Sequence, residues 1–329
     1  MTLAVAAAEA EANGLPRPRV VRAVCRRLGR TTVAYYDDLH RRERKSVDED
    51  ALVRLVNEIR AEMPFIGVRK LYHLLKGKLL QLGIKIGRDR FFGVLRRRGL
   101  LVERRAPSAP KTTKCDASLP VSLNLTKGLL LDGPNQVHVS DITYVRVGAG
   151  FAYLSLVTDR FTREVVGWHL SEDLKAAGPM AALRMAMKLV PAGMPVIEHS
   201  DRGSQYASKA YRGLLASFGL LSSMTEERHC YENGAAERVN GILKAEFGLG
   251  GRFATLGEAR KAIRQAIATY NTKRPHAMLG FHTPAEARAN PELVRPAALA
   301  AFEAARKISE RKAALRKAAE AAAHGDAAA

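Results

Sequence analysis

Residues 136–224 carry the pattern that most constrains the fold of this chain. The stretch QVHVSDITYVRV at 136–147 alternates apolar and polar residues and is rich in β-branched side chains, which predicts a strand. Short turns separate it from two further strand-like stretches, FAYLSLVTD at 151–159 and TREVVGWHL at 162–170, and connections this short predict antiparallel neighbours. Helix-like and strand-like stretches then alternate as far as LLSSM at 220–224. The pattern therefore predicts an α/β fold in which helices flank a mixed sheet of five strands.

Three carboxylates are placed where such a fold can bring them together. Asp141 lies in the middle of the first, otherwise apolar strand, where a charge is costly unless it meets a cation. Asp201 follows the apolar stretch PVIEHS, and open α/β sheets build their sites at the carboxyl ends of strands. Glu237 lies on a predicted helix, and its face also carries Asn233, Asn240, Gly241 and Lys244. Taken singly, each acid also has an ordinary explanation, as a strand-edge, turn or helix-surface residue.

A site made of these carboxylates would suit phosphoryl transfer. That reaction on DNA needs charge neutralisation at the scissile phosphate, and two metal ions roughly 3.5–4 Å apart provide it. Mg²⁺, with Mn²⁺ as the alternative, prefers hard oxygen ligands. We therefore expect Asp141, Asp201 and Glu237 to be both the catalytic residues and the metal ligands.

The charge of the chain narrows the class of partner. Its 329 residues contain 53 Lys and Arg but only 33 Asp and Glu, which gives a formal net charge of +20 at pH 7. Such an excess attracts a polyanion, and favours nucleic acid over a membrane surface. The three cysteines lie far apart, which argues against a disulfide framework and indicates a cytoplasmic protein. No apolar run is long enough to span a membrane.

Changes in composition divide the chain into five predicted parts. Residues 1–47 form a basic N-terminal segment, residues 48–103 a helix-turn-helix DNA-binding domain, 104–130 a linker, 131–290 the catalytic core, and 291–329 a C-terminal helix rich in Ala, Arg and Lys. The alternative for 48–103 is a small helical bundle with a solvated basic face. The basic side chains that we expect to contact DNA in this part are Arg69, Lys70, Arg88, Arg90, Arg96 and Arg97.

Several linked motifs resemble one known family. The chain is similar to the catalytic, second-frame protein of bacterial insertion-sequence transposases of the IS3 family, which are related to retroviral integrases. As that family's D-D-35-E pattern requires, 35 residues separate Asp201 from Glu237, and Lys244 follows the Glu by seven positions. His138 departs from the pattern, because the family commonly has Trp there, and we expect it to be packed beside the site. The stretches that carry the resemblance are NQVHVSDITYV, HSDRGSQYAS, SMTEERHCYENGAAERVNGILKAEF and YNTKRPHAMLGFHTPAEA.

The resemblance implies a fold, an activity and partners. The core would be ribonuclease-H-like, with an integrase-type catalytic site. The protein would bind the terminal repeats of its element, cleave DNA with Mg²⁺ and join 3′-hydroxyl ends to target DNA. Its partners would be double-stranded DNA, further copies of the same chain and the transposon protein of the upstream reading frame.

Other residues of these motifs have less specific roles. Lys244, Asn233, Gln205 and Tyr206 would line the path of the DNA, although Tyr206 would equally well cover the core. Arg274, with its neighbour His276, would bind a phosphate or, as the alternative, form a structural cap that closes the fold. His199 is expected to be packed beside Asp201, because Mg²⁺ prefers oxygen to imidazole nitrogen.

Two other functions fit the same sequence. One is a transposon-derived regulator that binds DNA without cutting it. The other is a ribonuclease-H-like nuclease that cuts without joining. The intact carboxylate triad disfavours the first, and the basic N-terminal part disfavours the second.

Overall fold

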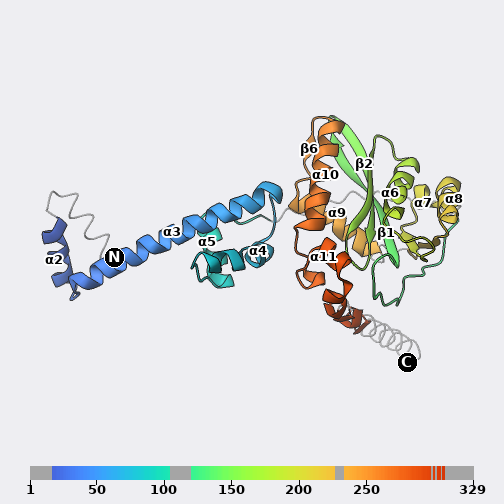
Figure 1. Cartoon of the computed structure of the whole chain (residues 1–329). Helices are drawn as coiled ribbons and strands as arrows, with labels where there is room; N and C mark the ends of the chain where they lie inside the picture. The colour runs from blue at the N-terminus through green and yellow to red at the C-terminus, as the bar shows by residue number, and fades with distance from the viewer. Residues whose placement is uncertain are drawn as a thin grey trace, which may run out of the picture. The chain divides into compact units, whose positions relative to one another are not determined.

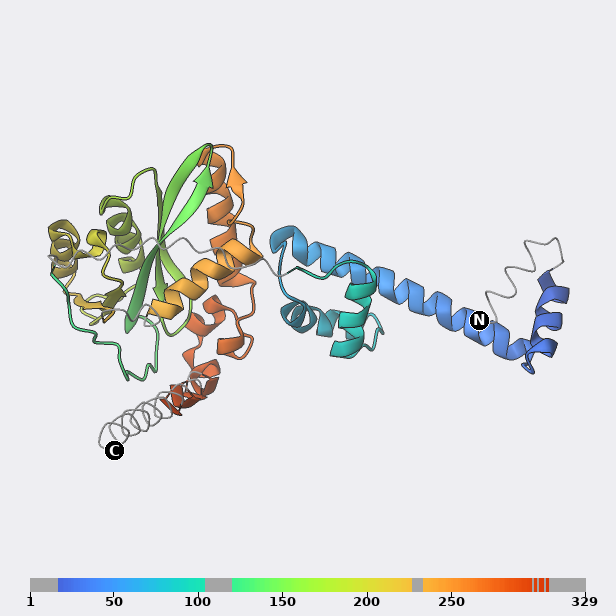
Figure 2. The ribbon, with the colours of Figure 1, turned by 180° about the vertical axis from the view of Figure 1, so that it is seen from behind.

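The computed structural model describes most of the chain, as Figures 1 and 2 show from opposite sides. By its contacts the chain divides into two units, which we describe separately: residues 1–59 with 75–101, and residues 60–74 with 102–329. Most of the predicted linker and of the predicted C-terminal helix lies outside the described residues. The residues described are 17–103, 120–226, 233–297, 299–300, 302–304 and 306–307.

The N-terminal part is helical. The helix that we expected to begin at residue 48 begins at Thr32 instead, because the sequence from there to Glu62 contains no Gly or Pro that would end it. The predicted boundary between residues 47 and 48 therefore falls inside a continuous helix. The helices are α2 (Arg17–Arg27), α3 (Thr32–Glu62), α4 (Val68–Gln81) and α5 (Arg88–Arg97).

Helix α5 is fixed in the first unit by an apolar face and by ion pairs. Phe91, Val94 and Leu95 are buried on one side of it. At its carboxyl end, Arg97 pairs with Glu49 of α3 at 2.6 Å. Gly83, with a φ of +75°, makes the tight turn before α5, a backbone conformation that favours glycine. Two short helices joined by a tight turn are what the helix-turn-helix prediction for this part requires.

The second unit is built on a mixed sheet with strand order β3-β2-β1-β4-β5. Strands β1, β2 and β3 are antiparallel neighbours, whereas β4 and β5 extend the sheet from β1 in parallel. The predicted five-strand, ribonuclease-H-like arrangement is thus confirmed, with a short sixth strand pairing with the far end of β1. The strands are β1 (Val137–Val147), β2 (Gly150–Asp159), β3 (Val165–Ser171), β4 (Ile197–Ser200), β5 (Leu221–Met224) and β6 (Arg252–Phe253).

Helices flank this sheet on both faces, as the two opposite views agree (Figures 1 and 2). Helices α6 to α8 lie on one side and α9 and α10 on the other. No helix in the described parts of the chain is long and apolar enough to cross a membrane. The helices are α6 (Ala177–Met187), α7 (Ser204–Ala207), α8 (Lys209–Ser217), α9 (Gly234–Glu246), α10 (Leu256–Thr272), η2 (Ala277–Leu279), α11 (Pro284–Ala289) and η3 (Pro291–Leu293).

Gly167 lets α6 approach the sheet closely. A Cβ added at this position of β3 would lie 2.1 Å from the carbonyl oxygen of Ala182 and 2.9 Å from the backbone nitrogen of Ala186. Both atoms belong to the backbone of α6, which a rotamer change cannot move. The close contact buries Val157 and Val166 against the two alanines.

Gly167→Ala should therefore destabilise the protein by about 3 kcal/mol, the upper end of the cost of overpacking a core. Urea unfolding followed by circular dichroism measures it. Gly213→Ala is the matched control, because Gly213 lies in α8 and an added Cβ there meets nothing within 4 Å. That change should raise stability by about 0.5–1 kcal/mol, since alanine favours helix. Equal effects of the two substitutions would contradict the close-contact account.

Candidate active site

Asp141 lies at the centre of the candidate site, on β1. Its backbone pairs with Leu156 of β2, and its carboxylate accepts a 2.6 Å hydrogen bond from the amide of Asn240 on α9. Burial and, to a smaller extent, the negative charges of Asp201 and Glu237 raise the pKa of Asp141 to about 7, against the hydrogen bond from Asn240. The site therefore holds more negative charge than its own donors neutralise.

Asp201 follows β4 directly, at the end of a strand that is parallel to β1. Its carboxylate accepts a 3.0 Å hydrogen bond from the backbone N–H of Gly203, which fixes its orientation. Burial raises the pKa of Asp201 above its ordinary value, while that hydrogen bond acts in the opposite direction. The parallel pairing of β1 and β4 explains how two acids far apart in sequence come to the same region.

Glu237 lies on the first turn of α9, a helix that packs on one face of the sheet. Burial and the charge of Asp201 together raise its pKa. Lys244 lies seven residues further along the helix and is near enough to Asp141 for that charge to raise its pKa, although burial lowers it overall. The face of α9 that carries Glu237, Asn240 and Lys244 thus faces the sheet carboxylates, as the helical spacing predicts.

The three acids are close enough to act on one another electrostatically but do not form a closed coordination set. In the portion of the chain that the structure describes, no three His, Cys, Asp or Glu side chains are grouped tightly enough to hold a metal ion. Their chemistry nevertheless suits Mg²⁺, since all three are hard oxygen donors with raised pKa values. A divalent cation would relieve the repulsion among them.

A buried polar network lies behind the site. Glu198 accepts hydrogen bonds from the hydroxyls of Ser140 and of Tyr211, the latter at 3.2 Å, and burial raises its pKa to about 7. His138 is fully buried beside it, and burial lowers its pKa to about 4, so that it is neutral at pH 7. His199 is also fully buried and its Nδ1 lies 2.9 Å from the hydroxyl of Ser223. The expected packing roles of both histidines agree with this placement.

Two residues expected to line the DNA path are buried. Tyr206 is 2% exposed and its ring contacts that of Tyr211 edge-on, so it covers the core, the alternative that the sequence left open. Asn233 is likewise 2% exposed and donates to the backbone carbonyl of Ser140 at 3.1 Å. We therefore correct the prediction for both residues: their side chains make contacts inside the protein and do not line a path for DNA. Gln205 is partly exposed and donates to the carbonyl of Leu174, so its contact with DNA stays a prediction.

Arg274 and Lys70 are also engaged within the protein. The guanidinium of Arg274 is 2% exposed and donates to both carboxylate oxygens of Glu246, at 2.8 and 2.9 Å. Lys70 donates to the same carboxylate at 2.9 Å. Burial would raise the pKa of Glu246, but these two cations hold it below its ordinary value. The structural-cap alternative for Arg274 is thus the correct one, and Lys70 shares its partner.

The remaining basic residues expected to contact DNA are on the surface. Arg90 and Arg96 are exposed on α5, with the guanidinium of Arg96 5.0 Å from the ring centre of Phe92. Arg88 and Arg97 are exposed but pair with Asp89 and Glu49. Arg69 is exposed on α4.

Sequence reasoning missed Asn240 as a partner of Asp141, although its position three residues after Glu237 on the same face was the available signal. Two further departures from the family pattern, His229 and Glu232, where the family commonly has Asn and Asp, lie outside the described residues.

Comparisons with known proteins place this geometry in context. The integrase core domain family matches residues 132–230, and a second integrase core domain family matches residues 219–284. The chain is 35% identical over 273 residues to the insertion element IS600 uncharacterized 31 kDa protein of Shigella sonnei, covering 80% of this chain and 97% of that protein. It is 31% identical over 225 residues to the transposase for insertion sequence element IS629 of Shigella sonnei, covering 67% of this chain and 73% of that protein. It is also 35% identical over 192 residues to the transposase InsF for insertion sequence IS3A of Escherichia coli (strain K12), covering 58% of this chain and 66% of that protein.

Solved structures give a more distant likeness. The catalytic core domain of HTLV-2 integrase is 20% identical, with a TM-score of 0.38, and the match covers 47% of this chain and 96% of that one.

The buried pair of Arg274 and Glu246 should contribute strongly to stability. Arg274→Met leaves Glu246 without its bidentate partner and should cost about 3 kcal/mol, as removal of one partner of a buried pair does. The adjacent Lys273→Met is the matched control, because Lys273 pairs with Glu62 at the surface and is 56% exposed. It should cost less than about 1 kcal/mol. Thermal and urea unfolding of both variants test this, and a small effect at Arg274 would contradict the structural role.

Proposed function

This chain belongs to the IS3 family of insertion-sequence transposases, which are DDE-type enzymes, and from that premise we propose which reaction it performs and how. It binds the terminal repeats of its own element, cleaves DNA there and joins the freed 3′-hydroxyl ends to target DNA. The observation that carries the proposal is the convergence of Asp141, Asp201 and Glu237. Burial and a neighbouring acid raise the pKa of Asp141 and of Glu237, and burial raises the pKa of Asp201.

The three carboxylates are the groups that would hold Mg²⁺. When bound, the metal would activate the attacking oxygen and neutralise charge at the scissile phosphate. The protein's own residues orient these ligands: Asn240 holds one oxygen of Asp141, and the N–H of Gly203 holds one oxygen of Asp201. Because α9 alone carries Glu237, the position of this helix decides whether the third ligand reaches the other two.

The remaining basic surface would bind the DNA. Lys244 lies on the same face of α9 as Glu237, where its positive charge would contact a phosphate near the scissile bond. In the region of residues 48–103, the exposed arginines would contact the element's end: Arg69, Arg88, Arg90, Arg96 and Arg97. A transposase must pair two ends, so we propose that a homo-multimer acts on double-stranded DNA. The protein of the upstream reading frame is proposed as a further partner.

Loss of any one carboxylate should abolish cleavage while leaving DNA binding measurable. Asp141→Asn, Asp201→Asn and Glu237→Gln each remove a charged ligand and should slow cleavage of a terminal-repeat duplex by about a thousandfold or more, equivalent to about 4 kcal/mol of transition-state stabilisation. Glu172→Gln is the matched control, because Glu172 is exposed on the loop after β3. This variant should cleave DNA as the unaltered protein does.

The assay is run with Mg²⁺, with Mn²⁺ and with a chelator, and binding is measured in parallel. Cleavage in the chelator, or full cleavage by all three variants, would contradict the proposal. Supplying a pre-cut end and a target duplex separates a transposase from a nuclease, since only the transposase forms joined product. A protein that binds the repeats but never cuts would instead be the non-catalytic regulator.

A further inference from the structure

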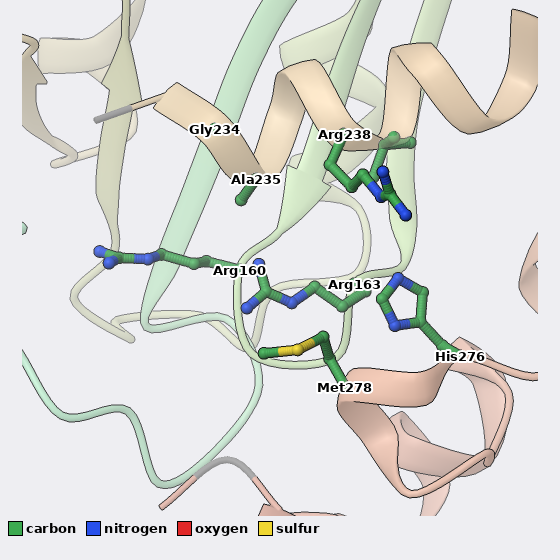
Figure 3. A pocket seen from close by; sticks show the side chains of 8 residues that line it. Arg160, Arg163, Gly234, Ala235, Arg238, His276 and Met278 are labelled. Carbon is green, nitrogen blue, oxygen red and sulfur yellow. The ribbon is translucent and has the colours of Figure 1, made fainter. Parts of the chain in front are cut away.

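A basic cavity lies against α9, on the side away from the carboxylates. Its volume is about 330 Å³, and Figure 3 shows it from close by. Consecutive residues of an α-helix are about 100° apart, so Ala235 and Val239 lie roughly opposite to Glu237, and Arg238 lies about 100° round the helix from it. The cavity is therefore a separate feature from the active site. Its lining includes Arg160, Arg163, Ala235, Arg238, His276 and Met278.

Arg163 is held firmly at the wall of this cavity. It lies in the turn between β2 and β3 with a φ of +62°, and its backbone N–H donates to the carbonyl of Asp159 at 2.8 Å. The side chain of Asp159 accepts from the backbone N–H groups of Phe161 and Thr162, each at 2.9 Å. The hydroxyl of Tyr270 donates to the carbonyl of Arg163 at 2.9 Å. The turn thus fixes the position from which the guanidinium enters the cavity.

The guanidinium groups in the cavity lack acidic partners. Neither Arg163 nor Arg238 forms a side-chain hydrogen bond or ion pair with any residue in the described ranges. Arg160 differs: its guanidinium donates to the carbonyl of Thr126 at 3.2 Å and extends away from the other two in Figure 3. Arg163 and Arg238 therefore supply positive charge without a direct acidic partner, although the charge of Asp159 acts on Arg163 from a distance.

His276 gives an independent indication that a ligand belongs here. Its side chain is only 7% exposed and its Nδ1 is buried with no hydrogen-bond partner among the described residues. Figure 3 shows the imidazole extending toward Arg163 and Arg238. Burial, together with the charges of Arg274 and Arg163, lowers the pKa of His276 to about 3. A neutral imidazole in such a positive environment is a hydrogen-bonding group that lacks its partner.

The amino-terminal end of α9 adds further donors. This helix has 13 residues, and Gly234 and Ala235 of its first turn line the cavity. The residue before it, Asn233, makes no side-chain cap and directs its amide to the carbonyl of Ser140 instead. The first N–H groups of a helix carry a partial positive charge and favour anions.

We propose that this cavity binds a phosphodiester of the DNA backbone at a position away from the scissile bond. Guanidinium groups and helix amino-terminal N–H groups are donors suited to phosphate oxygens. Arg238 is exposed at the rim, so a phosphate on a long polymer can reach the cavity from the surface. The proposal rests on the proposed function for the identity of the polymer, and a free phosphate ion is the other source of the same chemistry.

Binding of a labelled duplex at several salt concentrations, without metal, tests the proposal. Arg163→Gln and Arg238→Gln should each weaken binding about tenfold, as loss of a charged hydrogen bond does. Each should also reduce the slope of log affinity against log salt by about one, the signature of one lost phosphate contact. Arg264→Gln, which removes an exposed charge from α10, is the matched control and should bind almost as the unaltered protein does.

Two outcomes would overturn the proposal. One is that Arg163→Gln and Arg238→Gln bind DNA with the affinity and salt slope of Arg264→Gln. The other is that inorganic phosphate raises the melting temperature of the unaltered protein, but not of Arg163→Gln, while DNA affinity is the same for both. Arg238 is on the helix surface, so its variant keeps the test decisive if Arg163→Gln fails to fold. A protein that binds DNA with these slopes but never cleaves would refute the proposed function alone.

Discussion

Repulsion among three carboxylates is the constraint around which the second unit is organised. Burial raises the pKa of Asp141, Asp201 and Glu237, and the charge of Asp201 raises the pKa of the other two further, so a bound cation would stabilise their charged forms. The sheet and α9 oppose this repulsion through directional bonds. The amide of Asn240 and the N–H of Gly203 each hold one acid in place.

Helix α9 links the parts of the account. One face presents Glu237 and Lys244 to the sheet, and Arg238, about 100° round the helix from Glu237, lines the basic cavity. Its carboxyl end is anchored by Glu246, which receives both Arg274 and Lys70. A helix held in this way at its end has a defined axial position. Under the two proposals, a single helix would thus contribute to both the metal site and the phosphate site.

Local sequence patterns were sufficient to predict the hairpin strands and the residues that share one face of a helix. The alternation in β1 and the short hairpins predicted the antiparallel half of the sheet, and helical spacing put Lys244 on the face of Glu237. Arg274 was ambiguous because its partner Glu246 is 28 positions away, and no local pattern reports a tertiary ion pair. Tyr206 was ambiguous because an aromatic ring suits a core and a nucleic acid equally well. The predicted start of α3 was wrong because the charged stretch before residue 48 resembled a separate segment, although it contains no residue that ends a helix.

The central claim is that the three carboxylates form one cation site. Anomalous diffraction from crystals soaked in Mn²⁺ tests it most directly, because the signal locates the ion itself. The account predicts anomalous density ligated by Asp141 and Asp201, with Glu237 moving in to complete the ligand set. Density elsewhere on the protein, or none beside Asp141 at saturating Mn²⁺, would contradict it.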